Sequence, residues 1–290
     1  MRTDVDSVGQ GQIKALIRLL SDEDERIVTT IRAQLVQTGA VAVPLLQEAE
    51  IERPEMAERI TVVLDEIRGL HIEQELRILL ASTEGVADLE QGAMLIAQYA
   101  YPDLDRLTYR SKLNDMAADV RARIGRRASG EEAVRTLGRY LFTEQGFHGN
   151  TKNYYEPDNS YLNRVVDRRT GIPISLSLVY LLVGQRLGLP VFGVGMPGHF
   201  LVKFESERYT VFIDCFNAGA LLTEQDCGRF LTQAGYGVEA RFLAKSSTQA
   251  ILVRSLKNLV VIYQKLDDSV KEARLARFIE VLECTESGCG

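Results

Sequence analysis

The chain contains 290 residues, of which 46% are hydrophobic and 26% are charged, close to the average for a globular protein. A chain of this length can bury a substantial core, which argues against a disordered protein. The formal net charge of −6 argues against nucleic acid as a partner, because phosphate binding needs an excess of Lys and Arg.

The hydropathy pattern predicts neither a membrane span nor a secretory signal. The most apolar stretch, residues 172–183, is shorter than the roughly 18 residues that a span requires. The first eleven residues are polar and acidic, unlike the basic start and apolar run of a signal peptide. We therefore expect a cytoplasmic protein that binds no membrane.

Neither a metal site nor a cofactor is expected. The cysteines and histidines are scattered along the chain, at Cys215, Cys227, Cys284, Cys289, His71, His148 and His199. Their spacing matches no zinc site, and four cysteines are too few for a disulfide framework in a chain of this size.

The first region, residues 1–85, predicts paired amphipathic helices. Two helical patterns fill residues 12–49, and the segment from Ser21 to Asp24 supplies the turn and cap between them. Gly39 is expected to end the second helix and Pro44 to open the next one. Helical pairs at a period of about 40 residues resemble HEAT-type repeats. A plain helical bundle fits the pattern equally well.

The second region, residues 86–245, is expected to form the core domain. It begins with helices over residues 88–99, 104–124 and 131–142. The segment "GFHGNTKNYYEPDN", residues 146–159, predicts a long ordered loop. Asp158, Asn159 or Ser160 is expected to cap a helix that starts near Tyr161.

A second helix of the core is expected to start after the sequence "GIP" and to end at Gly188. Three antiparallel strands are then predicted over residues 191–195, 200–204 and 209–216, with a hairpin turn at residues 205–208. The last region, residues 246–290, predicts an antiparallel pair of helices over residues 250–266 and 269–283.

The order of these elements is the architecture of papain-like and transglutaminase-like enzymes. The block "GIPISLSLVYLLVGQRLGLPVFGVGMPGHFLVKF", followed by "YTVFIDCFNAG", resembles the transglutaminase-like core. The resemblance implies an α+β, mostly helical fold in which a helix packs on a small antiparallel sheet. It also implies that His199 holds the position of the general base and Asp214 that of the residue orienting it.

The resemblance further implies a nucleophilic Cys at the start of the central helix, where the positive end of the helix dipole lowers the pKa of a thiol. Aligned on Gly188, that position falls on Pro173. Ser175 follows two residues later, a rotation of about 200° around the helix. Because neighbouring residues of a strand face opposite sides, Cys215 is expected to point away from His199 and to be buried.

Longer motifs narrow the resemblance. The segments "LEQGAMLIAQYAYPDLD", "YYEPDNSYLNRVVDRRTGIPISLSLVY" and "IDCFNAGALL" are similar to the bacterial SirB-type branch of the transglutaminase-like superfamily. Members of that branch generally lack the catalytic Cys and have no settled activity. The C-terminal helical pair resembles one tetratricopeptide-type (TPR-like) repeat, and one pair cannot form the groove of a full array.

Three functions remain open from the sequence. The first is a non-catalytic scaffold that binds a protein partner, of unpredicted oligomeric state. The second is an amide or ester hydrolase, or an acyl transferase, that uses Ser175 with His199 and Asp214. The third is a site at which Tyr155, Asn159 and Asn217 bind a peptide or small polar ligand without turnover, although tyrosines in such a loop commonly serve only in packing.

Overall fold

The computed structural model describes residues 3–81, 86–125 and 128–283, which divide into two compact units between Gln74 and Glu75. The predicted α+β class, mostly helical with a small antiparallel sheet, is confirmed. Within the described ranges, every helix is too short or too polar to span a lipid bilayer.

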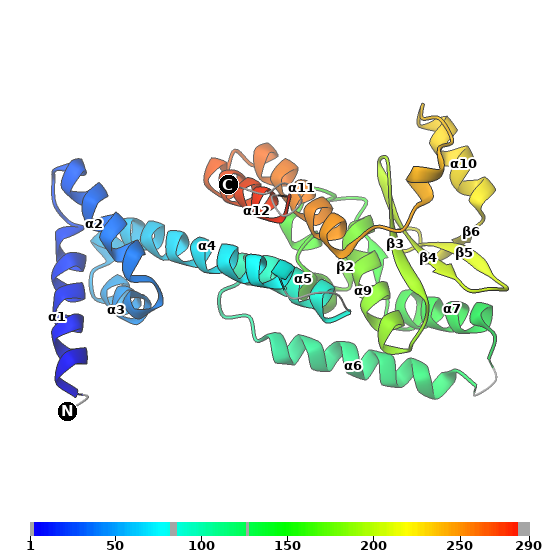
Figure 1. The fold of residues 1–290 in the computed structure, drawn as a ribbon, viewed down its shortest axis with the longest axis horizontal. Helices are drawn as coiled ribbons and strands as arrows, with labels where there is room; N and C mark the ends of the chain where they lie inside the picture. Colours follow the sequence, from blue (N-terminus) through cyan, green and yellow to red (C-terminus); the bar gives the residue numbers. More distant parts are fainter. Residues whose placement is uncertain (1–2, 82–85, 126–127, 284–290) are drawn as a thin grey trace. The chain divides into compact units, whose positions relative to one another are not determined.

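The described part of the first unit, residues 3–74, consists of helices and the turns between them (Figure 1). They are α1 (Thr3–Leu19), α2 (Glu25–Thr38), the 3₁₀ turn η1 (Gly39–Ala42), α3 (Val43–Glu52), the 3₁₀ turn η2 (Pro54–Met56) and the part of α4 (Ala57–Ala81) up to Gln74. Asp24 caps α2 by accepting a hydrogen bond from the Arg26 N–H, and Gly39 ends that helix with φ of +66°, as predicted. The assignment of the first unit to HEAT-type repeats stays a prediction.

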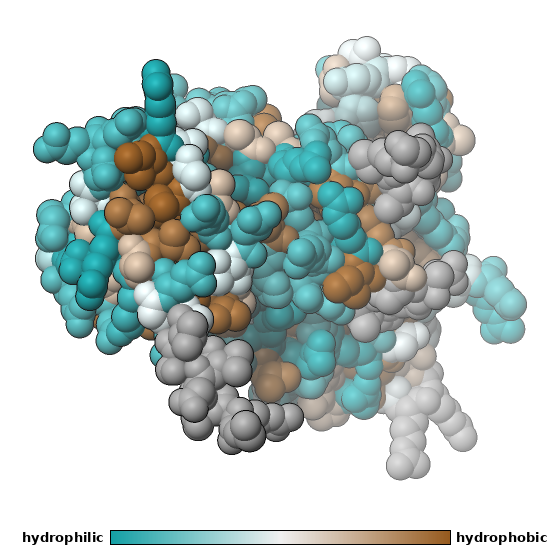
Figure 2. Space-filling view, turned by 60° about the vertical axis from the view of Figure 1, so that its left-hand side comes forward, coloured by the Kyte–Doolittle hydropathy of each residue, from teal (hydrophilic) through white to brown (hydrophobic). Residues whose placement is uncertain are grey.

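The core of the first unit lies between the helices, where Ile17, Leu35 and Ile60 are almost completely buried. Other apolar side chains stay at the surface, and Figure 2, with this unit turned forward, shows brown apolar side chains gathered within a largely polar surface. The most exposed of them are Val41 and Ile51.

The second unit contains the sheet and the remaining helices (Figure 1). The helices are α5 (Val86–Ala100), α6 (Arg106–Arg123), α7 (Gly130–Gly138), the π-helical turn η3 (Arg139–Glu144), the 3₁₀ turn η4 (Pro157–Asn159), α8 (Leu162–Arg168), α9 (Pro173–Arg186), α10 (Glu224–Gln233), the 3₁₀ turn η5 (Ala240–Leu243), α11 (Thr248–Lys265) and α12 (Ser269–Glu283). The expected cap of α8 by Asp158, Asn159 or Ser160 is wrong, because Tyr161 is the N-cap and forms no side-chain cap.

Helix α9 is the centre of this unit. Its residues from Pro173 to Gly184 are all buried, because α5, α6, α8, α11 and the sheet surround it. A helix that is covered on every side is expected to be apolar all round, which explains the nearly continuous hydrophobic sequence. The Tyr180 hydroxyl donates a hydrogen bond to the Val134 carbonyl at 3.1 Å, so the buried polar group has a partner.

The main sheet has four antiparallel strands in the order β3-β4-β5-β6: β3 (Val191–Met196), β4 (His199–Glu205), β5 (Thr210–Asp214) and β6 (Ala220–Leu222). The three predicted strands are present, and β6 was not predicted. A separate parallel pair joins β1 (His148–Gly149) to β2 (Thr170–Gly171), which ties the long loop to the start of α9.

The register of the sheet separates its two faces. Val191 faces α9, since a Cβ at Gly184 of that helix would lie 2.9 Å from its side chain. Gly193, two residues after Val191, lies on the same face and pairs with Val202, which pairs with Ile213. Val202 and Ile213 therefore also face α9. The opposite face carries Leu201 and Phe212, which pack with residues of α10.

Candidate functional site

His199 and Asp214 meet at one end of the sheet. His199 is the first residue of β4, directly after a turn in which Gly198 has φ of +72°, and Asp214 is the last residue of β5. The His199 Nε2 lies 2.9 Å from the Asp214 Oδ2, and only 11% and 9% of the two side chains are exposed. The contact has the distance of an ion pair, although the ring N–H is not aligned as in a regular hydrogen bond.

Asp214 is held by the turn that follows β5. Its Oδ1 accepts hydrogen bonds from the backbone N–H groups of Phe216 and Asn217, at 3.1 and 3.2 Å. The Asn217 Nδ2 donates to its Oδ2 at 2.8 Å. Burial would raise the pKa of Asp214, but His199 and the hydrogen bonds from Asn217 outweigh burial and hold the pKa below its ordinary value. The carboxyl is therefore ionised at neutral pH.

The second ring nitrogen of His199, Nδ1, forms no hydrogen bond within the described residues, and 11% of the side chain is exposed. The Phe230 ring of α10 lies beside the imidazole with a centroid separation of 5.6 Å. This contact had no sequence signal, because it depends on how α10 docks on the sheet. Chemically, the pair can position an imidazole, but it needs a neighbouring nucleophile to act as a general base.

Ser175 is engaged elsewhere. It is the third residue of α9 and completely buried, and its hydroxyl accepts a hydrogen bond from the Ile172 N–H at 3.0 Å. Its Oγ lies 2.5 Å from the Asn159 carbonyl oxygen, the closer of its two acceptors. The hydroxyl thus closes the first turn of α9, which begins at Pro173. Among the described residues no hydrogen bond joins Ser175 to His199 or Asp214.

The two described thiols are buried. Cys215 lies on the α9 face of the sheet, and burial raises the pKa of its thiol far above the ordinary value. The prediction that Cys215 is buried is confirmed. Cys227 lies in the apolar cluster under α10, where burial raises the pKa of its thiol to about 11. Neither thiol is ionised at neutral pH, and Cys284 and Cys289 lie outside the described residues.

The three predicted ligand-binding residues lie in different surroundings. Asn159 is completely buried, donates to the Asn153 carbonyl at 2.7 Å and accepts from the Asn150 amide at 3.2 Å. The Asn217 side-chain amide donates a hydrogen bond to the Asp214 carboxylate. Tyr155 is 47% exposed, and the Lys265 ammonium lies 3.5 Å from its ring centroid. Tyr155 and Asn217 are therefore exposed at the surface, whereas Asn159 is not.

A charged cluster that sequence reasoning missed orders the loop. Asp158 accepts hydrogen bonds from the Tyr101 hydroxyl and, at 2.9 Å, from the Arg164 guanidinium. Arg168 binds Glu156 at 2.8 Å. The pKa of Asp158 is held below its ordinary value, because these partners outweigh the effect of burial. Tyr101 precedes Asp158 by 57 residues, so no local sequence pattern indicated this contact.

The described residues contain no group of three or more His, Cys, Asp or Glu side chains arranged to hold a metal ion.

A central helix packed on an antiparallel sheet, with a His–Asp pair at the sheet end, defines a transglutaminase-like core. The model of the family described as "Transglutaminase-like superfamily" matches residues 107–257. The chain belongs to this superfamily.

Curated relatives are found in bacteria and mammals. A UPF0162 protein of Xylella fastidiosa (strain Temecula1) is 36% identical over 191 residues, covering 63% of this chain and 68% of the relative. F-box only protein 21 of Mus musculus is 31% identical over 185 residues, covering 57% of this chain and 27% of the relative. The UPF0162 protein PA3419 of Pseudomonas aeruginosa is 29% identical over 174 residues, covering 59% of this chain and 63% of the relative. No solved structure matches the chain.

Proposed function

We propose that this protein is a non-catalytic member of the superfamily whose core binds a segment of a partner protein. One observation carries the proposal: the His199–Asp214 pair is assembled, but the Ser175 hydroxyl is bonded to the Asn159 carbonyl and the Ile172 N–H. Pro173, at the position where the superfamily pattern has its Cys, carries no reactive group. Loss of a triad nucleophile removes about 10⁶-fold of rate in a well-studied protease.

In this proposal the retained pair has a structural role. It joins the start of β4 to the end of β5 and, through Asn217, holds the turn that leads into β6. The size of the mouse relative agrees with a binding role, because the matched region is about a quarter of that chain and so forms one module of a longer protein. The SirB-type branch and the TPR-like character of α11 and α12 belong to the same proposal.

Turnover assays on the wild-type chain and two single variants test the proposal. The substrates are p-nitrophenyl acetate for ester hydrolysis and a glutamine-containing peptide with a primary amine for acyl transfer. We expect rates that are the same, within twofold, for wild type, His199→Ala and Ser175→Ala. The assembled pair is the observation that favours the alternative, a hydrolase or acyl transferase. A rate that falls tenfold or more in both variants, with unchanged circular dichroism, would establish that alternative.

A further inference from the structure

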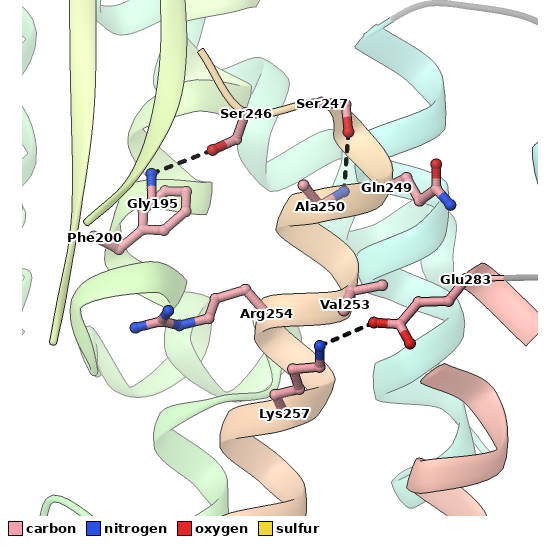
Figure 3. Close-up of a pocket in the computed structure, with 10 residues that line it drawn as sticks. All are labelled: Gly195, Phe200, Ser246, Ser247, Gln249, Ala250, Val253, Arg254, Lys257 and Glu283. Carbon is pink, nitrogen blue, oxygen red and sulfur yellow. Dashed lines mark hydrogen bonds and ion pairs between the residues drawn. The ribbon is translucent and has the colours of Figure 1, made fainter. Parts of the chain in front are cut away.

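A cavity of about 550 Å³ opens at the edge of the sheet, beside the start of α11 (Figure 3). Gly195 of β3 and Phe200 of β4 form one side, and residues of the first three turns of α11 form the other. Phe200, Ala250 and Val253 make part of its lining apolar. The cavity thus combines an apolar surface with charged groups at its rim, which is typical of a site for a mixed ligand.

Arg254 is the charged group that points to a ligand. Its side chain is partly buried in the cavity wall, and it forms no hydrogen bond or ion pair within the described part of the chain. Figure 3 shows the guanidinium directed toward the side on which Gly195 and Phe200 lie. Its positive charge acts on Tyr154, where it opposes the rise in pKa that burial causes. A guanidinium in such a position offers parallel N–H donors to an incoming acid.

The other polar groups of the cavity already have partners. Lys257 pairs with Glu283 at 2.9 Å on the side away from the strands. The Ser246 hydroxyl accepts from the Gly195 N–H at 3.2 Å, and the Ser247 hydroxyl caps α11 by accepting from the Ala250 N–H. The start of α11 therefore needs no anion, and Arg254 is the group left to bind one.

The charge balance selects the kind of acid. The three charged lining residues, Arg254, Lys257 and Glu283, sum to +1, which matches one carboxylate. A polyanion would bring more negative charge than this sum balances. The apolar lining adds a place for a hydrophobic neighbour of that carboxylate.

We propose that this cavity binds an acidic segment of a partner protein, with an Asp or Glu on Arg254 and an adjacent apolar side chain against Phe200 and Val253. The inference rests on the proposed function, because it gives the binding module its site and the chemistry of its partner. It uses neither His199 nor Asp214.

A peptide array on the full chain tests this. Each octapeptide carries one Glu between two apolar residues, and every peptide has a matched version with Gln. We expect Glu peptides to bind and Gln versions to bind at least tenfold more weakly. By fluorescence anisotropy with the best Glu peptide, Arg254→Gln is expected to weaken binding by about 10-fold to 100-fold, the range of a charged hydrogen bond.

Two further variants make the result specific. Arg208→Gln removes one positive charge from the exposed turn between β4 and β5, and we expect a change of less than twofold. Gly195→Val changes no charge but fills the cavity, since a Cβ at Gly195 meets nothing closer than the Ser246 hydroxyl at 3.5 Å. We expect it to weaken binding by at least tenfold while the melting temperature stays within a few degrees.

The outcomes separate the two proposals. Equal binding of Glu and Gln peptides, or equal binding by wild type and Arg254→Gln, overturns the cavity proposal and leaves the non-catalytic assignment standing. Mass spectrometry of the bound peptides shows whether the protein converts them chemically. Some peptides could bind through Arg254 and also be chemically converted by wild type but not by His199→Ala. That result would support the cavity proposal and overturn the non-catalytic assignment.

Discussion

At the scale of single residues, the surroundings of Asp214 favour its charged form. Its carboxylate receives three hydrogen bonds from the turn that follows β5 and lies 2.9 Å from the His199 ring. Its pKa is therefore lower in the folded protein than in the unfolded chain, where an Asp titrates near about 3.9. By linkage, the ionised carboxylate stabilises the fold above that pH, and this stability is lost as the pH falls through the lowered pKa.

The variant Asp214→Asn tests this sign. We expect its free energy of unfolding at pH 7 to be lower than that of wild type by about 1.5 to 3 kcal/mol, because hydrogen bonds to a charged group are lost. The difference should shrink as the pH is lowered from about 5 to 3, since protonation then removes the charge from wild type as well. Urea unfolding at several pH values measures it. A difference that stays constant over this range contradicts the assignment.

At the scale of elements, the short pair β1 and β2 places the long loop against the candidate site. A Cβ on Gly149 would lie 2.5 Å from the Phe216 ring, so the strand approaches that ring more closely than any other residue type would permit. The same ring contacts Tyr154 of the loop at a centroid separation of 6.1 Å. Phe216 in turn donates its backbone N–H to Asp214, so β1, the loop and the His–Asp pair are connected.

Two glycine variants separate this contact from general backbone effects. Gly149→Ala is expected to lower the free energy of unfolding by about 1 to 3 kcal/mol, because the added methyl displaces the Phe216 ring. Gly138→Ala, where a Cβ meets nothing within 4 Å in a helical conformation, should instead raise it by about 0.5 to 1 kcal/mol. Both values come from urea unfolding. Equal effects of the two changes would show that the Phe216 contact is not tight.

At the scale of the whole molecule, the chain divides between Gln74 and Glu75 into two units with separate buried clusters. Because each unit has its own core, damage to one is expected to leave the other folded. Leu35 is completely buried in the first unit, so Leu35→Ala should destabilise that unit by about 2 to 5 kcal/mol.

Hydrogen exchange on the full chain measures whether the two units unfold separately. In Leu35→Ala we expect faster exchange of the backbone amides of α2 and of residues 57–74 of α4, with unchanged protection of α9 and β4. Binding of the acidic peptide should stay within twofold of wild type. A uniform loss of protection through both units would show that the chain unfolds as one cooperative body.

The amino-acid sequence by itself determined the local elements, since their signals are carried by neighbouring residues. Asp24 and Gly39 bound α2, and Gly188, with φ of +75°, follows α9 as the helix stop. The motifs around His199 and Asp214 also led to the superfamily. Only the tertiary structure decided what each side chain contacts: Ser175 bonds to Asn159, Phe230 lies beside His199, and Arg254, next to a cavity, has no hydrogen bond or ion pair among the described residues. Such contacts join residues far apart in the chain, and they depend on how helices dock on the sheet, which no local pattern encodes.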